Sequence, residues 1–138
     1  EMKRDLASRV EHIAEMTRAG EARYPETVEA YKARLRAAIE EMVGQNVDEA
    51  RLLTEVAVMA DRSAIAEETV RLHAHIAQLR ECLEKPEPVG RRIDFLVQEL
   101  NREVNTISSK SQDVPITQLV ISMKAEIEKL REQLQNIE

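Results

Sequence analysis

Residues 116–137 read ITQLVISMKAEIEKLREQLQNI and carry the most regular pattern of the chain. Their apolar residues are separated by alternating steps of four and three: Ile116, Val120, Met123, Ile127, Leu130, Leu134 and Ile137. This spacing places one apolar stripe along a helix, and its repetition over about three heptads is typical of coiled-coil packing. Asp113 is a good N-cap before this segment, and Pro115 suits a first helical turn. The segment therefore predicts a long helix that packs against other helices.

The segments upstream show the same kind of spacing less regularly. Apolar stripes predict five further helices: Met2 to about Ala19, ended by Gly20; Pro25 to Met42; Asp48 to about Asp61; Ser63, as a cap, to Leu83; and about Arg91 to Ile107. The helix from Asp48 is apolar on more than one side, which predicts burial between neighbours. The stretch Lys85–Gly90 is the clearest loop. The predicted fold is all-α, an extended bundle of long amphipathic helices with coiled-coil-like seams.

The composition of the chain supports this fold class. Among 138 residues, 43% are hydrophobic and 33% are charged, but there are only three Gly, four Pro and three aromatic residues. Sandwiches and barrels of β-strands need frequent turns and aromatic or β-branched strands, so they are nearly excluded. The single cysteine, Cys82, forms no internal disulfide, which suits the cytoplasm. No apolar run approaches the roughly 18 residues of a membrane helix, so no membrane partner is expected.

The net charge of −6 argues against a general affinity for nucleic acid. Residues 85–138 carry eight basic and nine acidic residues, a net charge of −1, and residues 1–84 therefore carry −5. Any site for a polyanion must then be a local patch or lie between subunits.

The segment from Arg91 to Lys110 has an unusual polar face. Uncharged polar side chains occupy positions where a solvated helix usually has Glu or Lys: Gln98, Asn101, Asn105, Thr106 and Ser108. Glu99 and Glu103 are four residues apart and share a face, so they could bind one divalent cation. Arg102 and Lys110 could hold a phosphate. Together these are the parts of a phosphodiesterase site, with a polar seam between subunits or an ordinary salt-bridged face as the alternatives.

Histidines in the preceding helix offer one more candidate. His73 and His75 are two residues apart and point in different directions, which excludes a two-histidine zinc spacing. His75 lies beside the apolar Ile76. It could serve as a general base or a metal ligand, or it could be a histidine whose hydrogen bonds are satisfied at a helix interface. Glycine-rich phosphate loops and nucleophile elbows are absent. Phe95 is the only aromatic residue of the second half, so no aromatic platform for bases is expected there.

Two runs of the sequence resemble the signature of the bacterial YicC/YloC family. They are GRRIDFLVQELNREVNTI at residues 90–107, followed by Ser109-Lys110, and MKAEIEKLREQLQNIE at residues 123–138. Glu67, Glu68, Arg71, Leu72 and His75 fit the same family upstream. The resemblance covers about residues 50–138 well and residues 1–50 loosely. The chain departs from the family pattern at Ala64, Ala66, Ala74 and Ser108, where polar residues or glycine are usual.

The resemblance implies a cytoplasmic endoribonuclease that depends on a divalent metal, manganese in particular. It also implies a homo-oligomer, a hexamer, and a chain that is the C-terminal helical half of a longer protein. Residues 1–62 would be a helical middle region and residues 63–138 the C-terminal helical domain with the family signature.

The residues and the resemblance together predict a cation held by Glu99 and Glu103, with Asp94 or His75 as a third ligand or base. The cation would polarise the scissile phosphate or activate a water. Attack by water would leave a 5′-phosphate and attack by the ribose 2′-hydroxyl a cyclic phosphate, and the sequence leaves both open.

The same reading assigns RNA contacts to the polar face. Arg102 and Lys110 would neutralise charge on the phosphoryl oxygens, and Gln98 and Asn105 would position the RNA by hydrogen bonds. The alternative is a non-catalytic helical module that oligomerises or grips RNA, with the chemistry in an N-terminal part that lies outside this sequence. On that alternative, the polar face fixes the register of a subunit interface.

Overall fold

The computed structural model describes residues 2–44, 46–85 and 90–137. Within these residues it contains helices and no strand, which confirms the all-α prediction. There are five helices in the described residues: α1 (Met2–Val43), α2 (Glu49–Ser63), α3 (Ala66–Glu84), α4 (Gly90–Lys110) and α5 (Val114–Ile137).

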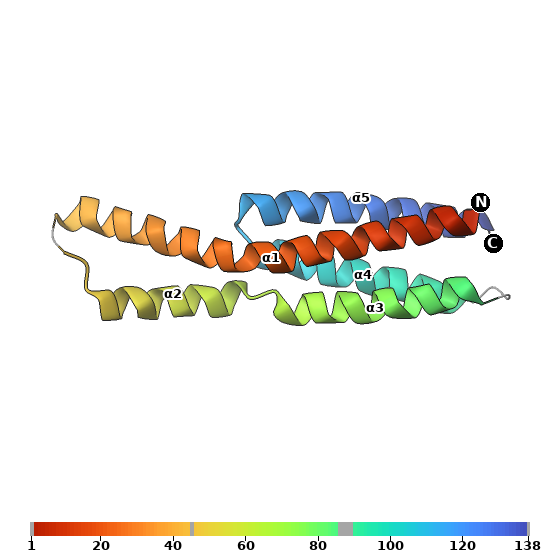
Figure 1. Cartoon of the computed structure of the whole chain (residues 1–138), viewed down its shortest axis with the longest axis horizontal. Coiled ribbons are helices and arrows are strands. Elements are labelled where there is room, and N and C mark those ends of the chain that lie inside the picture. The colour runs from red at the N-terminus through yellow and green to blue at the C-terminus, as the bar shows by residue number, and fades with distance from the viewer. Residues whose placement is uncertain (1, 45, 86–89, 138) are drawn as a thin grey trace.

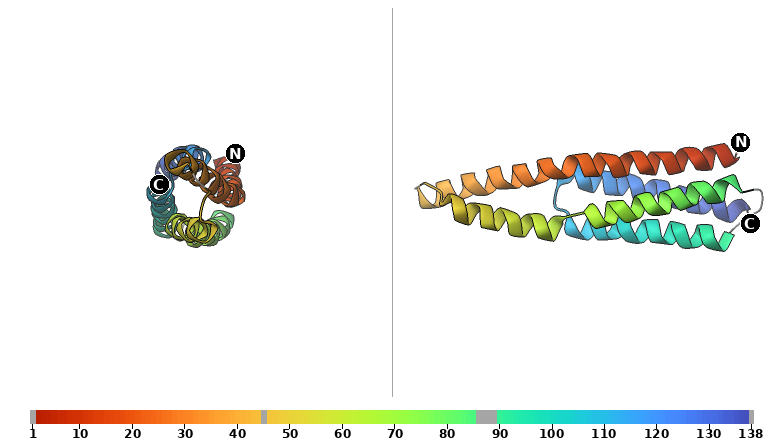
Figure 2. Two further views of the ribbon diagram at one scale, coloured as in Figure 1. Left: turned by 90° about the vertical axis from the view of Figure 1, so that its left-hand side faces the viewer. Right: turned by 60° about the horizontal axis from the view of Figure 1, so that its bottom comes forward.

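The first half of α1 forms a four-helix bundle with α3, α4 and α5 (Figures 1 and 2). The order around the bundle is α1, α3, α4 and α5, and each helix runs antiparallel to both of its neighbours. The second half of α1 extends beyond the bundle, and α2 folds back along it to form a two-helix arm (Figure 1). The molecule therefore has a four-helix end and a two-helix end.

The core of the bundle is made by the predicted apolar stripes. The seam of α5 is buried from Ile116 to Leu134, as the alternating four-and-three spacing predicts. Leucine and isoleucine side chains from the other three helices meet it, each at most 2% exposed: Leu6, Ile13, Leu72, Ile76, Leu79, Leu96, Leu100 and Ile107. Burial of this kind stabilises a fold by about 1.5–3 kcal/mol per large side chain.

The prediction that Gly20 and Pro25 separate two helices is wrong, because α1 continues through both residues. Gly20 is buried, and a Cβ atom there would make only ordinary van der Waals contacts, at 3.9 Å from Ile65 and 4.0 Å from Leu119. Proline removes one backbone hydrogen bond from the interior of a helix, at a cost of about 3 kcal/mol. The helix persists because it packs on α3 and α5 before Pro25 and on α2 after it.

Two predictions about α2 and its end are also wrong. Leu52 and Val56 are buried, but Leu53 is 51% and Val58 is 41% exposed, because α2 packs mainly on α1 and not between several neighbours. Ser63 ends α2 instead of capping α3, and its hydroxyl donates to the carbonyl oxygen of Met59 at 2.8 Å.

The remaining boundaries agree with the sequence more closely. Asp113 does cap α5, since its Oδ2 accepts the backbone N–H of Ile116 at 3.3 Å. The loop predicted at Lys85–Gly90 falls largely on residues 86–89, which lie outside the described residues. None of the helices, as far as they are described, is both long and apolar enough to cross a membrane.

Candidate functional site

The adjacent antiparallel helices α3 and α4 bring three potential metal ligands together. His75 of α3 and Glu99 and Glu103 of α4 each offer one ligand atom, and these atoms lie within 4.8 Å of one another. Glu103 is buried at 4% exposure, whereas His75 and Glu99 are half-buried. The Nδ1 atom of His75 is buried and has no hydrogen-bond partner among the described residues. One imidazole and two carboxylates form a donor set that suits a divalent cation such as Mn²⁺.

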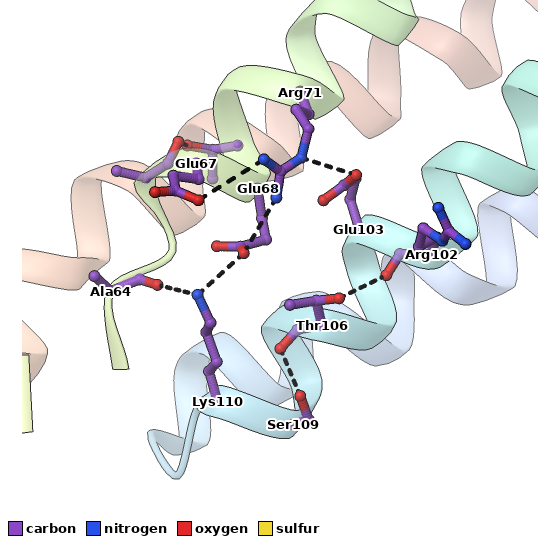
Figure 3. Close-up of polar contacts among 11 residues, drawn as sticks. Ala64, Glu67, Glu68, Arg71, Arg102, Glu103, Thr106, Ser109 and Lys110 are labelled. Carbon is purple, nitrogen blue, oxygen red and sulfur yellow. Dashed lines mark hydrogen bonds and ion pairs between the residues drawn. The ribbon is translucent and has the colours of Figure 1, made fainter. Parts of the chain in front are cut away.

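A network of charged side chains holds Glu103 from the side of α3 (Figure 3). The Nε atom of Arg71 forms an ion pair with Oε2 of Glu103 at 3.0 Å, and its Nη2 atom donates to Oε2 of Glu68 at 3.4 Å. The ammonium group of Lys110 donates to the same oxygen of Glu68 and to the carbonyl oxygen of Ala64, both at 3.0 Å. Glu103 is therefore fixed in orientation by a neighbour that is itself held by the buried Glu68.

Arg71 is the electrostatic centre of this network. Its hydrogen bond to Glu103 raises the pKa of the guanidinium above its ordinary value, and the negative charges of Glu103, Glu68 and Glu67 raise it further. Arg71 therefore stays charged throughout the ordinary pH range. Its charge offsets the repulsion that Glu68 and Glu103 would otherwise exert on each other.

The polar face of α4 is open to solvent beside this cluster. Gln98, Arg102 and Asn105 are all exposed, and 73% of the Arg102 side chain is accessible. The Nη1 atom of Arg102 lies 3.9 Å from Oε2 of Glu99, which is a loose ion pair that leaves the guanidinium available. The face can therefore accept an extended anionic ligand next to the three potential ligands.

Asp94 and His73 lie outside the cluster of His75, Glu99 and Glu103. Asp94 is half-buried and does not belong to the group of His75, Glu99 and Glu103. The hydrogen bond to Glu128 is the main cause that raises the pKa of Arg131 on α5, and the charge of Asp94 adds the smallest contribution. His73 points away from His75, as predicted, and its Nε2 lies 2.9 Å from Oε1 of Glu21.

Arg71 and Glu68 were not predicted as site residues and were named only as part of the family pattern. Glu68 is buried at 2% exposure, with one oxygen that has no partner in the described structure. The spacing Glu68, Arg71, His75 is the signal that could have found them, because residues three and four apart share one face of a helix. That face is the one that meets α4.

A family model described as "Endoribonuclease YicC-like, C-terminal" matches residues 20–138. The chain belongs to this family. The likeness drawn from the residues of α4 and α5 is thereby confirmed.

Two relatives of this YicC-like chain carry the name "Probable endoribonuclease YicC". The one from Clostridioides difficile is 52% identical over 113 residues, which are 80% of this chain and 39% of that protein. The one from Haemophilus influenzae is 37% identical over 133 residues, which are 96% of this chain and 46% of that protein. The chain thus spans less than half the length of the curated relatives it matches. The cluster of His75, Glu99 and Glu103 lies within the residues that match the YicC-like family model.

Proposed function

We propose that this chain provides the metal centre of a metal-dependent endoribonuclease. The observation that carries the proposal is the cluster of His75, Glu99 and Glu103, with ligand atoms within 4.8 Å and a buried imidazole nitrogen that has no partner among the described residues. The names of the relatives support the reaction class, since both are called probable endoribonucleases.

In this proposal three residues bind the cation and a fourth residue orients one of them. Glu103, Glu99 and His75 hold the cation, for which Mn²⁺ is our candidate because imidazole and carboxylate ligands both suit it. When bound, the cation supplies Lewis acidity that polarises a phosphoryl oxygen of the RNA. Arg71 keeps the Glu103 carboxylate oriented and is therefore a positioning residue.

The exposed face of α4 binds the RNA strand. Arg102 pairs with a phosphate through its planar guanidinium, and Gln98 and Asn105 donate hydrogen bonds to phosphate or sugar oxygens. Lys110 keeps positive charge near this face while it holds Glu68. Asp94 is not among the ligands of this proposal, because it lies outside the cluster, and the end chemistry of the products is left to experiment.

The assembly and location of the protein belong to the same proposal. We propose a homo-oligomer, a hexamer, that acts in the cytoplasm, and the division of this chain into residues 1–62 and 63–138 stays a prediction. Light scattering of the whole protein tests the oligomer directly.

The decisive experiment compares carboxylate variants of the whole protein that contains this chain. Glu103→Gln and Glu99→Gln should each lower Mn²⁺-dependent cleavage of a structured RNA about 100-fold or more, and EDTA should abolish cleavage by the parent. Calorimetry should show weaker Mn²⁺ binding by the same variants. Glu81→Gln, on the exposed face of α3, is the matched control and should change neither quantity.

Arg71→Gln sharpens this test. Because the variant keeps all three ligands and loses only the group that orients Glu103, Mn²⁺ affinity should fall about tenfold. Unchanged affinity would remove Arg71 from the proposal without affecting the ligands.

The second candidate is a non-catalytic module, and the open, mostly uncharged face of α4 is the observation that favours it. If Glu103→Gln and Arg102→Ala leave cleavage unchanged but alter the mass of the oligomer, the face is an interface and the metal proposal fails. Normal mass with lost cleavage supports the metal centre.

A further inference from the structure

A cavity lies where the arm joins the bundle. It has a volume of about 310 Å³ and is bounded by α1 on one side, by α2 on the other and by the connection between α4 and α5 at its end. The lining includes Tyr24, Tyr31 and Arg34 of α1, Arg62 of α2 and Lys110 of α4. The cavity is large enough for a small ligand, since such sites begin at about 300 Å³.

Both tyrosines of the chain line this cavity, although aromatic residues are only 2% of the sequence. Tyr24 and Tyr31 are seven residues apart, which places them two turns apart on one face of α1. The hydroxyl of Tyr24 donates to the carbonyl oxygen of Ala60 at 2.6 Å and lies 3.1 Å from Oγ of Ser63, so its ring is held in place. Tyr31 is half-buried and offers a second ring. Aromatic rings of this kind stack on nucleic-acid bases.

Cations from three different helices surround the rings, in a chain whose net charge is −6. Arg34 and Arg62 are exposed and form no ion pair within the described part of the chain. Of the two carboxylates in the lining, Asp113 is neutralised by Arg23 through two hydrogen bonds of 2.9 Å, whereas Glu55 is not. The cavity therefore combines aromatic rings with an excess of cations that can bind phosphate.

Lys110 connects this cavity to the candidate metal centre. Its side chain borders the cavity, and its ammonium group binds Glu68, which shares Arg71 with Glu103. Lys110 and Glu103 are seven residues apart on α4, which corresponds to about 10 Å along the helix axis. This distance reaches only the near edge of the cavity, and Tyr31 and Arg34 lie farther out along α1, so a strand that occupies both sites spans several nucleotides.

We propose that the cavity binds an unpaired base of single-stranded RNA, with the base stacked on Tyr31 and the adjoining phosphate on Arg34 and Arg62. The proposal rests on the proposed function, because it places this nucleotide on the same strand as the phosphate that is cleaved. It makes the RNA substrate one with an unpaired segment at the cleavage site.

Binding is measured with the whole protein and a fluorescent oligouridylate in EDTA, so that no cleavage occurs. Tyr31→Leu should weaken binding about tenfold, because the stacking face is lost while an apolar side chain remains, and Tyr31→Phe should stay within about twofold of the parent. A base-paired RNA of equal length should bind more weakly than oligouridylate and should not respond to Tyr31→Leu. Circular dichroism of each variant checks that the helices are retained.

The cations are tested by the salt dependence of the same binding. Arg34→Gln and Arg62→Gln should each reduce the slope of log affinity against log salt by about 0.7, the value for one phosphate contact on a single strand. Arg18→Gln removes one exposed charge from the bundle half of α1 and should leave the slope unchanged. If inorganic phosphate competes as well as uridine monophosphate, no base is held and the proposal is overturned.

The outcomes separate this inference from the proposed function. If Tyr31→Leu binds oligouridylate like the parent while Glu103→Gln abolishes cleavage, the base site fails and the metal centre stands. If Tyr31→Leu loses binding while Glu103→Gln cleaves normally, the base site stands and the metal centre fails.

Discussion

The bundle and the arm have the same kind of sequence and very different interiors. In the bundle, Ile13, Ile76 and Leu130 are completely buried. In the arm, Leu35 and Ile39 stand at equivalent helical spacing but are only half-buried. The number of partner helices makes the difference, because a helix in the bundle packs on two neighbours and the outer half of α1 packs on α2 alone.

Helix α1 has a fully packed half in the bundle and a half-exposed half in the arm. Among its residues from Lys3 to Val43, the buried ones lie between Leu6 and Gly20, and none from Glu21 onward is buried. The candidate metal centre lies in the well-packed bundle, where ligands are held most rigidly, and the cavity with both tyrosines lies where the arm begins. Rigid packing and open binding surface are thus separated along one helix.

The largest effect is expected from a matched pair of substitutions in α1. Ile13→Ala should lower the free energy of unfolding by about 2–5 kcal/mol, because it leaves a cavity in a core that cannot collapse. Ile39→Ala should lower it by only about 1 kcal/mol, because its side chain already contacts solvent. Urea denaturation of both variants measures the difference, and equal losses would contradict the contrast between bundle and arm.

A smaller effect is expected at the point where α1 leaves the bundle. Pro25→Ala restores one backbone hydrogen bond within a continuous helix, worth about 3 kcal/mol in propensity. Without proline the unfolded chain gains conformational entropy, and this reduces the gain in the free energy of unfolding by up to about 1 kcal/mol. The variant should therefore be more stable by about 2 kcal/mol, with slower amide exchange around residue 25. A loss of stability would indicate that α1 is not continuous there.

The smallest effect is expected from the ion pair that ties α1 to the start of α5. The hydrogen bond from Arg23 holds the pKa of Asp113 below its ordinary value, and the backbone N–H of Ile116 lowers it further. A carboxyl with a lowered pKa stabilises the fold above the unfolded-state pKa, and the contribution is lost as the pH falls below about 4. Asp113→Asn should lower the midpoint of thermal unfolding by about 2–3 °C at pH 7.

The same variant supplies its own control. Asparagine still caps a helix, so the variant keeps the start of α5 and loses only the charge. Parent and variant should therefore converge as the pH falls through the lowered pKa of Asp113. A difference that persists at low pH would show that Arg23 contributes no charge-dependent stability through Asp113.

Much of the fold follows from local patterns. The seam of α5, its cap at Asp113 and the stripes of α3 and α4 were predicted from spacing alone, because each helix must bury one apolar face. The break at Gly20 and Pro25 was predicted wrongly, because local helix propensity there is overruled by contacts that α1 makes with three other helices. Burial of Leu53 and Val58 was overestimated, since an apolar pattern does not reveal how many neighbours are available.

For the candidate site, the sequence determined which residues of α4 share a face, because a helix repeats every 3.6 residues whatever surrounds it. It therefore named Glu99 and Glu103 together, with His75 as one of two further ligands. Only the tertiary structure decided that His75 and not Asp94 joins them, that Arg71 orients Glu103, and that two tyrosines of α1 lie beside Lys110. Such neighbours are tens of residues apart along the chain, so their proximity arises from how the helices pack against one another and not from any local pattern.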